Sequence, residues 1–239
     1  LVLRRQRQMC IRDRFRAYHD EKQWEDVLDG THRTCKALVA HGAKHLVLID
    51  SISERRAPTA GRVNEAEQMS KEEWSSYRER ITTSARIGAE EYGLTVGIHA
   101  HAAGFMDFEP ELERLLSEVD EEILKICFDT GHHSYAGFDP VEFMQKYISR
   151  ISYIHFKDID PKVKQKVLDN RTGFYDACGQ GIFCNLGDGD VDFPTVRKIL
   201  LENNFEGWCT VEQDCDPLLD PNPLSDAQLN REYLETIGF

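Results

Sequence analysis

Long apolar runs are absent from this sequence, and so are dense basic clusters beyond its first 16 residues. A membrane helix needs about 20 consecutive apolar residues, and a signal peptide needs an apolar segment after its basic start. Neither pattern occurs. The formal net charge is −13, whereas affinity for nucleic acid depends on clustered lysine and arginine. We therefore expect a cytoplasmic chain whose partners include neither a membrane nor a nucleic acid.

Paired cysteines are missing too. The seven cysteines form no Cys-x-x-Cys pair, which is the spacing of thiolate zinc sites and of thioredoxin-like redox motifs. An odd number of cysteines spread over a chain of this size is typical of a reduced intracellular protein, in which the thiols pack among other side chains. The cysteines are Cys10, Cys35, Cys127, Cys178, Cys184, Cys209 and Cys215.

The first 14 residues differ from the rest of the chain. Six arginines lie between Arg4 and Arg16, and apolar residues do not recur there with a helical or strand period. The stretch MCIRDR also matches the translation of a transposon-end sequencing adapter. We predict that residues 1–14 are an unpatterned basic segment that is not native, and that residues 15–239 form the catalytic domain. A transit peptide or a genuine basic leader is the alternative.

Helical and strand patterns alternate along the rest of the chain. Apolar residues recur at intervals of three and four from Glu21 to Gly42, and Ser70 with Glu73 predicts a capping box before a second helix. Short apolar runs between the helical segments are typical of strands buried on both faces. Five such strands are predicted, at residues 46–50, 94–98, 125–129, 151–156 and 208–212. Residues 158–190 are expected to form one long loop or a small inserted helix.

Repeated strand–helix units without hairpin patterns predict a parallel sheet of the α/β class. Every predicted strand ends in a polar residue that can take part in chemistry. A barrel collects the carboxyl ends of its strands at one mouth, so residues from different strands can meet around one ligand. We therefore predict a TIM-type (β/α)8 barrel that is truncated at its N-terminus, so that about five β/α units remain.

Four of the predicted strand ends carry residue types that bind metals. His99 with His101, Asp129, His155 and Glu212 each follow a separate apolar strand. A mixed set of imidazole and carboxylate ligands is typical of a site for Mn²⁺, Co²⁺ or Mg²⁺ more than of a zinc site built from thiolates. Taken singly, each residue could cap a turn, fill the core or lie on the surface. Together they predict a metal site.

Several segments of the sequence resemble one enzyme family. They are IHAHAAGFMDFEPELERLL, CFDTGHHSYAGFDP, YIHFKDIDP, GFYDACGQGIFCNLGDGDVDFPTVRKIL and GWCTVEQDCDP. These segments are similar to the inosose dehydratase branch of the xylose-isomerase-like sugar phosphate isomerase/epimerase superfamily. That resemblance implies a metal-dependent β/α barrel whose usual ligands are Glu, Asp, His and Glu on four successive strands. It also implies that FRAYHD is the tail of the third strand, so that strands 4–8 are the ones present.

The resemblance assigns roles residue by residue. It places the second to fourth metal ligands at Asp129, His155 and Glu212, whereas His99 stands where relatives commonly have a glutamate. His99 could still bind the metal through a ring nitrogen, or three protein groups could hold it with substrate and water. The predicted catalytic residues are Glu212, His101 and Lys157, and the predicted substrate-binding residues are His132, His101 and Glu109.

The activity implied by the resemblance is dehydration of a keto-inositol, such as 2-keto-myo-inositol (scyllo-inosose), to a cyclic dione in inositol catabolism. A divalent metal, Mn²⁺ or Co²⁺ with Mg²⁺ as an alternative, would stabilise the enolate, while one group accepts a proton and another delivers one. A sugar or hydroxypyruvate isomerase or epimerase of the same superfamily would form the same enolate and stays open. A non-catalytic sugar-binding fragment also stays open. The expected partner is a small polyol or keto-sugar, and a homo-oligomer is left open.

Overall fold

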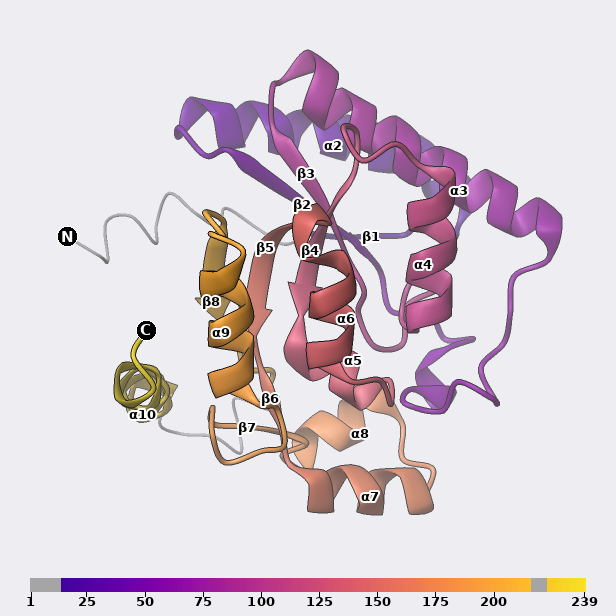
Figure 1. The fold of residues 1–239 in the computed structure, drawn as a ribbon. Coiled ribbons are helices and arrows are strands. Elements are labelled where there is room, and N and C mark those ends of the chain that lie inside the picture. The colour runs from indigo at the N-terminus through magenta and orange to yellow at the C-terminus, as the bar shows by residue number, and fades with distance from the viewer. Residues whose placement is uncertain (1–13, 216–222) are drawn as a thin grey trace.

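A six-stranded parallel sheet forms the centre of the fold (Figure 1). The computed structural model describes residues 14–215 and 223–239. Across the sheet the strands follow the order β1-β2-β3-β4-β5-β8. Their bounds are β1 Arg14–Arg16, β2 His45–Asp50, β3 Thr95–His99, β4 Lys125–Asp129, β5 Ile151–Phe156 and β8 Trp208–Val211.

The parallel α/β architecture and the five predicted strands are confirmed, with strand ends that agree to within a residue. A sixth strand, β1, overlaps the start of FRAYHD. Within the described residues β1 and β8 are the two edges of the sheet and do not pair with each other. That earlier barrel strands are missing stays a prediction. The prediction that the basic N-terminal segment is not native concerns residues 1–13, which lie outside the described part, and Arg14.

Helices follow the strands as the sequence predicts. Ser70 and Glu73 form the predicted capping box at the start of α3. The longest helix, α2, has 17 residues, and no helix in the described ranges is long and apolar enough to cross a membrane. The helices are α2 Trp24–Ala40, α3 Lys71–Arg86, α4 Glu109–Glu118, α5 Thr130–Tyr135, α6 Pro140–Tyr147, α7 Pro161–Asp169, α8 Phe174–Gly179, α9 Phe193–Glu202 and α10 Pro223–Thr236. Shorter helical turns are η1 Glu21–Gln23, η2 Ala57–Thr59, η3 Ile87–Glu91 and η4 Ile148–Arg150.

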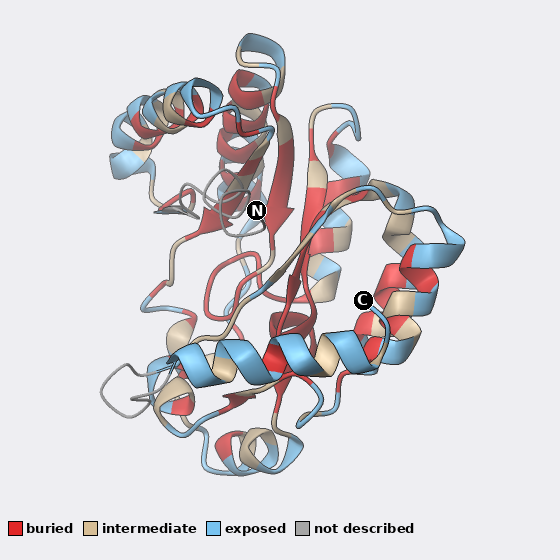
Figure 2. Ribbon diagram, turned by 90° about the vertical axis from the view of Figure 1, so that its left-hand side faces the viewer, coloured by how far each residue is buried: buried red, intermediate tan, exposed pale blue. Residues whose placement is uncertain are grey.

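The two faces of the sheet differ because successive side chains of a strand point in opposite directions. On one face Ile98, Phe128 and Ile154 belong to the main hydrophobic core, which includes side chains of the surrounding helices. On the other face His99, Asp129 and His155 are also buried, although they are polar. Figure 2 shows the central strands mostly buried. The alternation therefore gives the sheet one face for packing and one face that carries polar chemistry.

Residues 158–190 are more structured than the sequence predicts. They contain α7, α8 and a small antiparallel pair, β6 Asp158–Ile159 with β7 Phe183–Cys184. The buried carboxylate of Asp158 accepts backbone N–H groups from residues 159, 187, 189 and 191 and so fixes the following loop. A Cβ atom at Gly189 would lie 2.2 Å from Asp158 Oδ1, so this close approach requires glycine. Strands of two residues have no readable period, which is why the sequence did not indicate them.

Candidate active site

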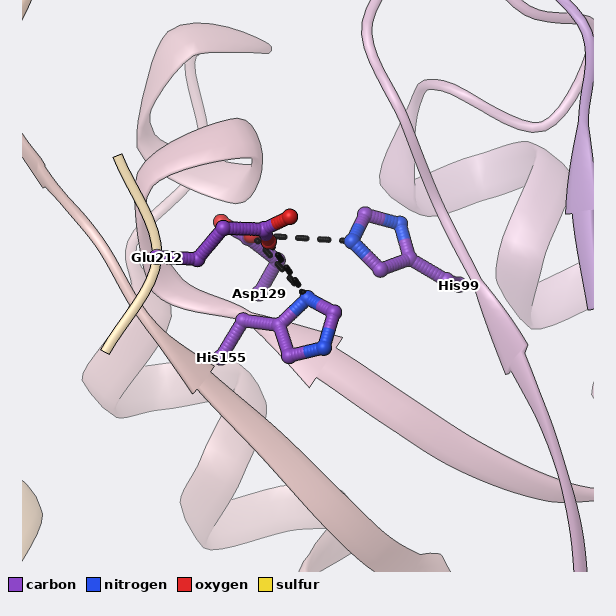
Figure 3. Close-up of side chains that lie close together, drawn as sticks. All are labelled: His99, Asp129, His155 and Glu212. Atoms are coloured by element: carbon purple, nitrogen blue, oxygen red, sulfur yellow. Dashed lines mark ion pairs between the residues drawn. The ribbon is translucent and has the colours of Figure 1, made fainter. Parts of the chain in front are cut away.

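Four buried or half-buried side chains meet at the carboxyl end of the sheet (Figure 3). His99 ends β3, Asp129 ends β4, His155 lies in β5, and Glu212 directly follows β8. One nitrogen or oxygen atom from each lies within 4.8 Å of the others. His155 Nδ1 is 2.7 Å from Glu212 Oε2, and His99 Nε2 is 3.5 Å from Asp129 Oδ2. We call these residues the four-residue cluster.

The four-residue cluster has the donor atoms that a divalent cation needs. Within the described part of the chain, Asp129 Oδ2 and Glu212 Oε2 accept no hydrogen bond of acceptable geometry, although both are shielded from solvent. Buried carboxylate oxygens normally have such partners, and a bound cation supplies what a hydrogen-bond donor would. Two imidazoles and two carboxylates form a mixed nitrogen and oxygen set. The structure brings together the residues predicted as ligands, and their role as ligands stays a prediction.

Residues 129–132, Asp-Thr-Gly-His, form a local motif that begins with Asp129. Its Oδ1 accepts the backbone N–H of His132 at 2.8 Å and caps α5, which leaves Oδ2 directed toward the four-residue cluster. A Cβ atom on Gly131 would lie 2.5 Å from Lys157 Cγ, so glycine makes room for the lysine side chain. The motif therefore places a potential ligand, a helix start and a histidine within four residues.

Lys157 connects the four-residue cluster to a second group of polar residues, made up of His101, His132, Asp214 and Lys157 itself. Lys157 is 1% exposed. Its Nζ is 3.3 Å from Asp129 Oδ2 and 2.9 Å from Asp214 Oδ2. Burial opposes the lysine charge, but the carboxylates of Asp129, Glu212 and Asp214 outweigh burial and raise the pKa of Lys157. Lys157 is therefore a buried ammonium group held by surrounding carboxylates.

The surroundings of the two histidines of the second group favour the neutral form of both rings. Their ring centroids are 3.9 Å apart. Burial, followed by the charge of His132, lowers the pKa of His101 well below its usual value. Burial, followed by the charge of Lys157, also lowers the pKa of His132. The backbone N–H of Ala102 donates to His132 Nδ1 at 3.3 Å, and His132 Nε2 lies 3.0 Å from Lys157 Nζ and 3.3 Å from Asp214 Oδ2.

The sequence analysis did not identify Asp214. Its Oδ2 is 3.3 Å from His132 Nε2 and 2.9 Å from Lys157 Nζ. Asp214 comes two residues after Glu212, so in an extended segment both side chains point to the same side. The two-residue spacing between Glu212 and Asp214 is the feature of the sequence that could have identified Asp214.

His133 was given no role in the sequence analysis, yet it is buried beside the predicted substrate-binding residue Glu109. His133 Nε2 is 3.1 Å from Glu109 Oε2. Glu109 therefore pairs with His133 and belongs to neither the four-residue cluster nor the second group.

A pocket of about 600 Å³ opens beside the second group. This volume is in the range that small-molecule sites occupy in proteins. Aromatic and polar side chains contribute to its wall together, as in many small-molecule sites. Its lining residues are Phe15, Ser51, Ile52, His101, Phe174, Tyr175, Cys178, Gln213, Asp214 and Cys215.

A buried carboxylate holds the loop that follows β3 and contains His101. Asp107 Oδ2 accepts the backbone N–H of Ala103 at 3.0 Å, and Ala103 has a φ of 69°. This left-handed backbone is costly for alanine and persists only where the surrounding contacts hold it. Asp107 is 3% exposed, and burial raises its pKa from 3.8 to about 7. Asp107 is thus protonated in the folded protein below neutral pH.

We expect the raised pKa of Asp107 to make the folded protein lose stability as the pH rises. Between pH 4 and 7 the folded state holds a proton that the unfolded state has released, so unfolding is favoured by up to about 1.4 kcal/mol per pH unit. Asp107→Asn stays neutral and keeps an oxygen acceptor for Ala103. Urea unfolding of both proteins at pH 5, 6 and 7 measures the difference. Parallel pH profiles for the two proteins would contradict the assignment.

Comparison with known proteins identifies the family. A family model described as xylose isomerase-like TIM barrel matches residues 12–237. The chain belongs to this family. The solved structure of the IOLI protein with a bound zinc atom shares the fold, with a TM-score of 0.67 at 17% identity over 96% of this chain and 73% of that chain.

Among curated proteins, several relatives similar to this chain are named inosose dehydratase. One from Clostridium botulinum (strain Alaska E43 / Type E3) is 36% identical over 164 residues, which cover 69% of this chain and 54% of that protein. Another from Geobacillus kaustophilus (strain HTA426) is 32% identical over 225 residues, which cover 92% of this chain and 71% of that protein. The chain spans about half the length of the first of these relatives.

Proposed function

We propose that this chain catalyses the metal-dependent dehydration of a keto-inositol, such as 2-keto-myo-inositol, to a cyclic dione. The observation that carries the proposal is the buried Lys157, which contacts both the four-residue cluster and the pocket-lining Asp214. Dehydration beside a ketone needs a proton acceptor, a proton donor and stabilisation of charge on the carbonyl oxygen. The similarity to proteins named inosose dehydratase supports the choice of substrate.

The four-residue cluster would hold one divalent cation. Bound there, the cation would act as a Lewis acid that stabilises negative charge on the ketone oxygen. The two imidazoles suit Mn²⁺ or Co²⁺ better than Mg²⁺, which prefers oxygen ligands. Zinc also accepts such donors, and a zinc atom is bound in the IOLI structure. The ligands in this proposal are His99, Asp129, His155 and Glu212.

The second group would move the protons. The neutral ring of His101, which lines the pocket, would accept the proton from the carbon beside the ketone, with the carboxylate of Glu212 as the other candidate acceptor. The electron pair of the broken C–H bond moves toward the carbonyl group. The C–O bond of the neighbouring hydroxyl then breaks, and the ammonium group of Lys157 protonates the departing oxygen, which leaves as water. His132 and Glu109 remain the predicted substrate-binding residues.

The activity can be tested directly. Purified protein supplied with 2-keto-myo-inositol and Mn²⁺ or Co²⁺ is expected to form a dione, which is detected by its ultraviolet absorbance. Treatment with EDTA should remove most of this turnover, because the carbonyl oxygen then loses its charge stabilisation.

Product analysis by NMR in D₂O separates the competing activities. An isomerised sugar that carries solvent deuterium, without any dione, would contradict the dehydratase proposal and favour an isomerase or epimerase. Binding of the keto-inositol without turnover of any inosose would favour a sugar-binding fragment.

A further inference from the structure

A layer of small and polar side chains lies directly beneath the four-residue cluster. Its members precede the cluster residues by two positions, so they share the same face of the sheet one step deeper. Cys127 precedes Asp129, Tyr153 precedes His155, and Thr210 precedes Glu212. Tyr153 Oη and Thr210 Oγ1 are hydrogen-bonded to each other at 2.6 Å. Cys127 is 1% exposed, and its sulfur has a different partner.

That partner is the imidazole of His155. Cys127 Sγ lies 3.7 Å from His155 Nε2, while the other ring nitrogen, Nδ1, lies 2.7 Å from Glu212 Oε2. The ring is therefore held with one nitrogen in the four-residue cluster and the other against the sulfur. The neighbouring strand leaves space for this arrangement, because a Cβ atom at Gly97 would lie 2.9 Å from the backbone nitrogen of Cys127 and 3.2 Å from its Cβ.

The geometry restricts which nitrogen can carry the proton. A neutral imidazole has one N–H, and the nitrogen that binds a cation must offer its lone pair. If Nδ1 faces the cation, the N–H is on Nε2, which lies 3.7 Å from Cys127 Sγ, a distance at which sulfur can accept it. Histidines that bind metals normally donate their second N–H to a carboxylate, a carbonyl group or water, and this contact fixes the ring.

We propose that Cys127 is a positioning residue for the metal centre. Its sulfur accepts the Nε2–H of His155 and thereby keeps the Nδ1 lone pair directed into the four-residue cluster. This inference rests on the proposed metal centre. It adds to that proposal a buried side chain that touches neither substrate nor cation.

Substitutions at Cys127 test the contact. Cys127→Val has a similar volume but no acceptor, and it is expected to weaken Zn²⁺ binding 10- to 100-fold in competition with a chromophoric chelator. Cys127→Ser restores an acceptor and should recover part of that loss. Cys35→Val is the matched control, because Cys35 is also fully buried but lies in α2, in the core on the helix-facing side of the sheet. Its Zn²⁺ affinity should equal that of the unsubstituted protein.

A second measurement separates positioning from general loss of structure. In proton–nitrogen NMR spectra of the metal-free protein, the Nε2-bound proton of His155 should shift upfield and exchange faster with water in Cys127→Val than in Cys127→Ser.

If the valine variant does not fold, Cys127→Ser is compared with the unsubstituted protein instead. The His155 resonance and the Zn²⁺ affinity of the serine variant then test whether Cys127 positions His155. An unchanged His155 resonance, or valine-variant affinity within twofold of that of Cys35→Val, would overturn the proposal. Failure of the unsubstituted protein to bind Zn²⁺ would instead contradict the metal centre, and the metal-free spectra would still report on Cys127.

Discussion

Replacing Lys157 with methionine is expected to lower turnover of 2-keto-myo-inositol about 1,000-fold and to destabilise the metal-free protein by about 3 kcal/mol. The loss of turnover follows because methionine cannot donate a proton. The loss of stability follows because Asp129, Glu212 and Asp214 would retain their charges without the ammonium group that they surround. The stability effect is placed at the lower end of the usual range because Glu212 and Asp214 are 34% and 33% exposed.

Adding a divalent cation should separate the two effects of the Lys157→Met substitution. A cation in the four-residue cluster replaces the missing positive charge but not the missing proton, so chemical denaturation should show restored stability while turnover stays low. Lys166→Met is the matched control, since Lys166 is exposed in α7. Full turnover by Lys157→Met at saturating substrate would remove this lysine from the proton transfer.

Replacing Asp129 with asparagine is expected to weaken cation binding at least 100-fold and to reduce turnover below detection. The asparagine oxygen can still accept the backbone N–H of His132, so α5 keeps its cap and the fold should persist. What is lost is the second, negatively charged oxygen that faces His99 and His155. Titration calorimetry with Mn²⁺ measures the affinity, and circular dichroism checks the fold.

Asp139→Asn provides the control for the Asp129 substitution. Asp139 also caps a helix, because its Oδ1 accepts the backbone N–H groups of Val141 and Glu142 at the start of α6. This variant should bind Mn²⁺ normally. If Asp129→Asn and Asp139→Asn bind Mn²⁺ equally well, Asp129 acts only as a helix cap.

The sequence predicted the site residues that can be recognised from their place at the end of one strand. His99, Asp129, His155 and Glu212 each end or follow a short apolar run, and parallel strands bring their carboxyl ends to one edge. Local pattern was therefore sufficient to place these four residues together. The order of the elements also predicted the parallel sheet, because strand and helix signals alternate without hairpin signals.

The sequence could not predict contacts that depend on the three-dimensional path of the chain. The second group joins His132, Lys157 and Asp214 from three separate segments, and only their packing shows that one ammonium group contacts two carboxylates of the four-residue cluster. Glu109 is an instructive case, because only the packing shows that this residue at the start of α4 has its carboxylate against His133. Contacts between such distant segments leave no periodic signal in the sequence.

The most direct measurement of the central claim is anomalous X-ray scattering from crystals of the chain loaded with Mn²⁺. The account predicts one strong peak per chain, at about 2.0–2.3 Å from donor atoms of the four-residue cluster, with Lys157 not coordinated. A peak held instead by His101, His132 and Asp214, or no peak at saturating Mn²⁺, would contradict the account.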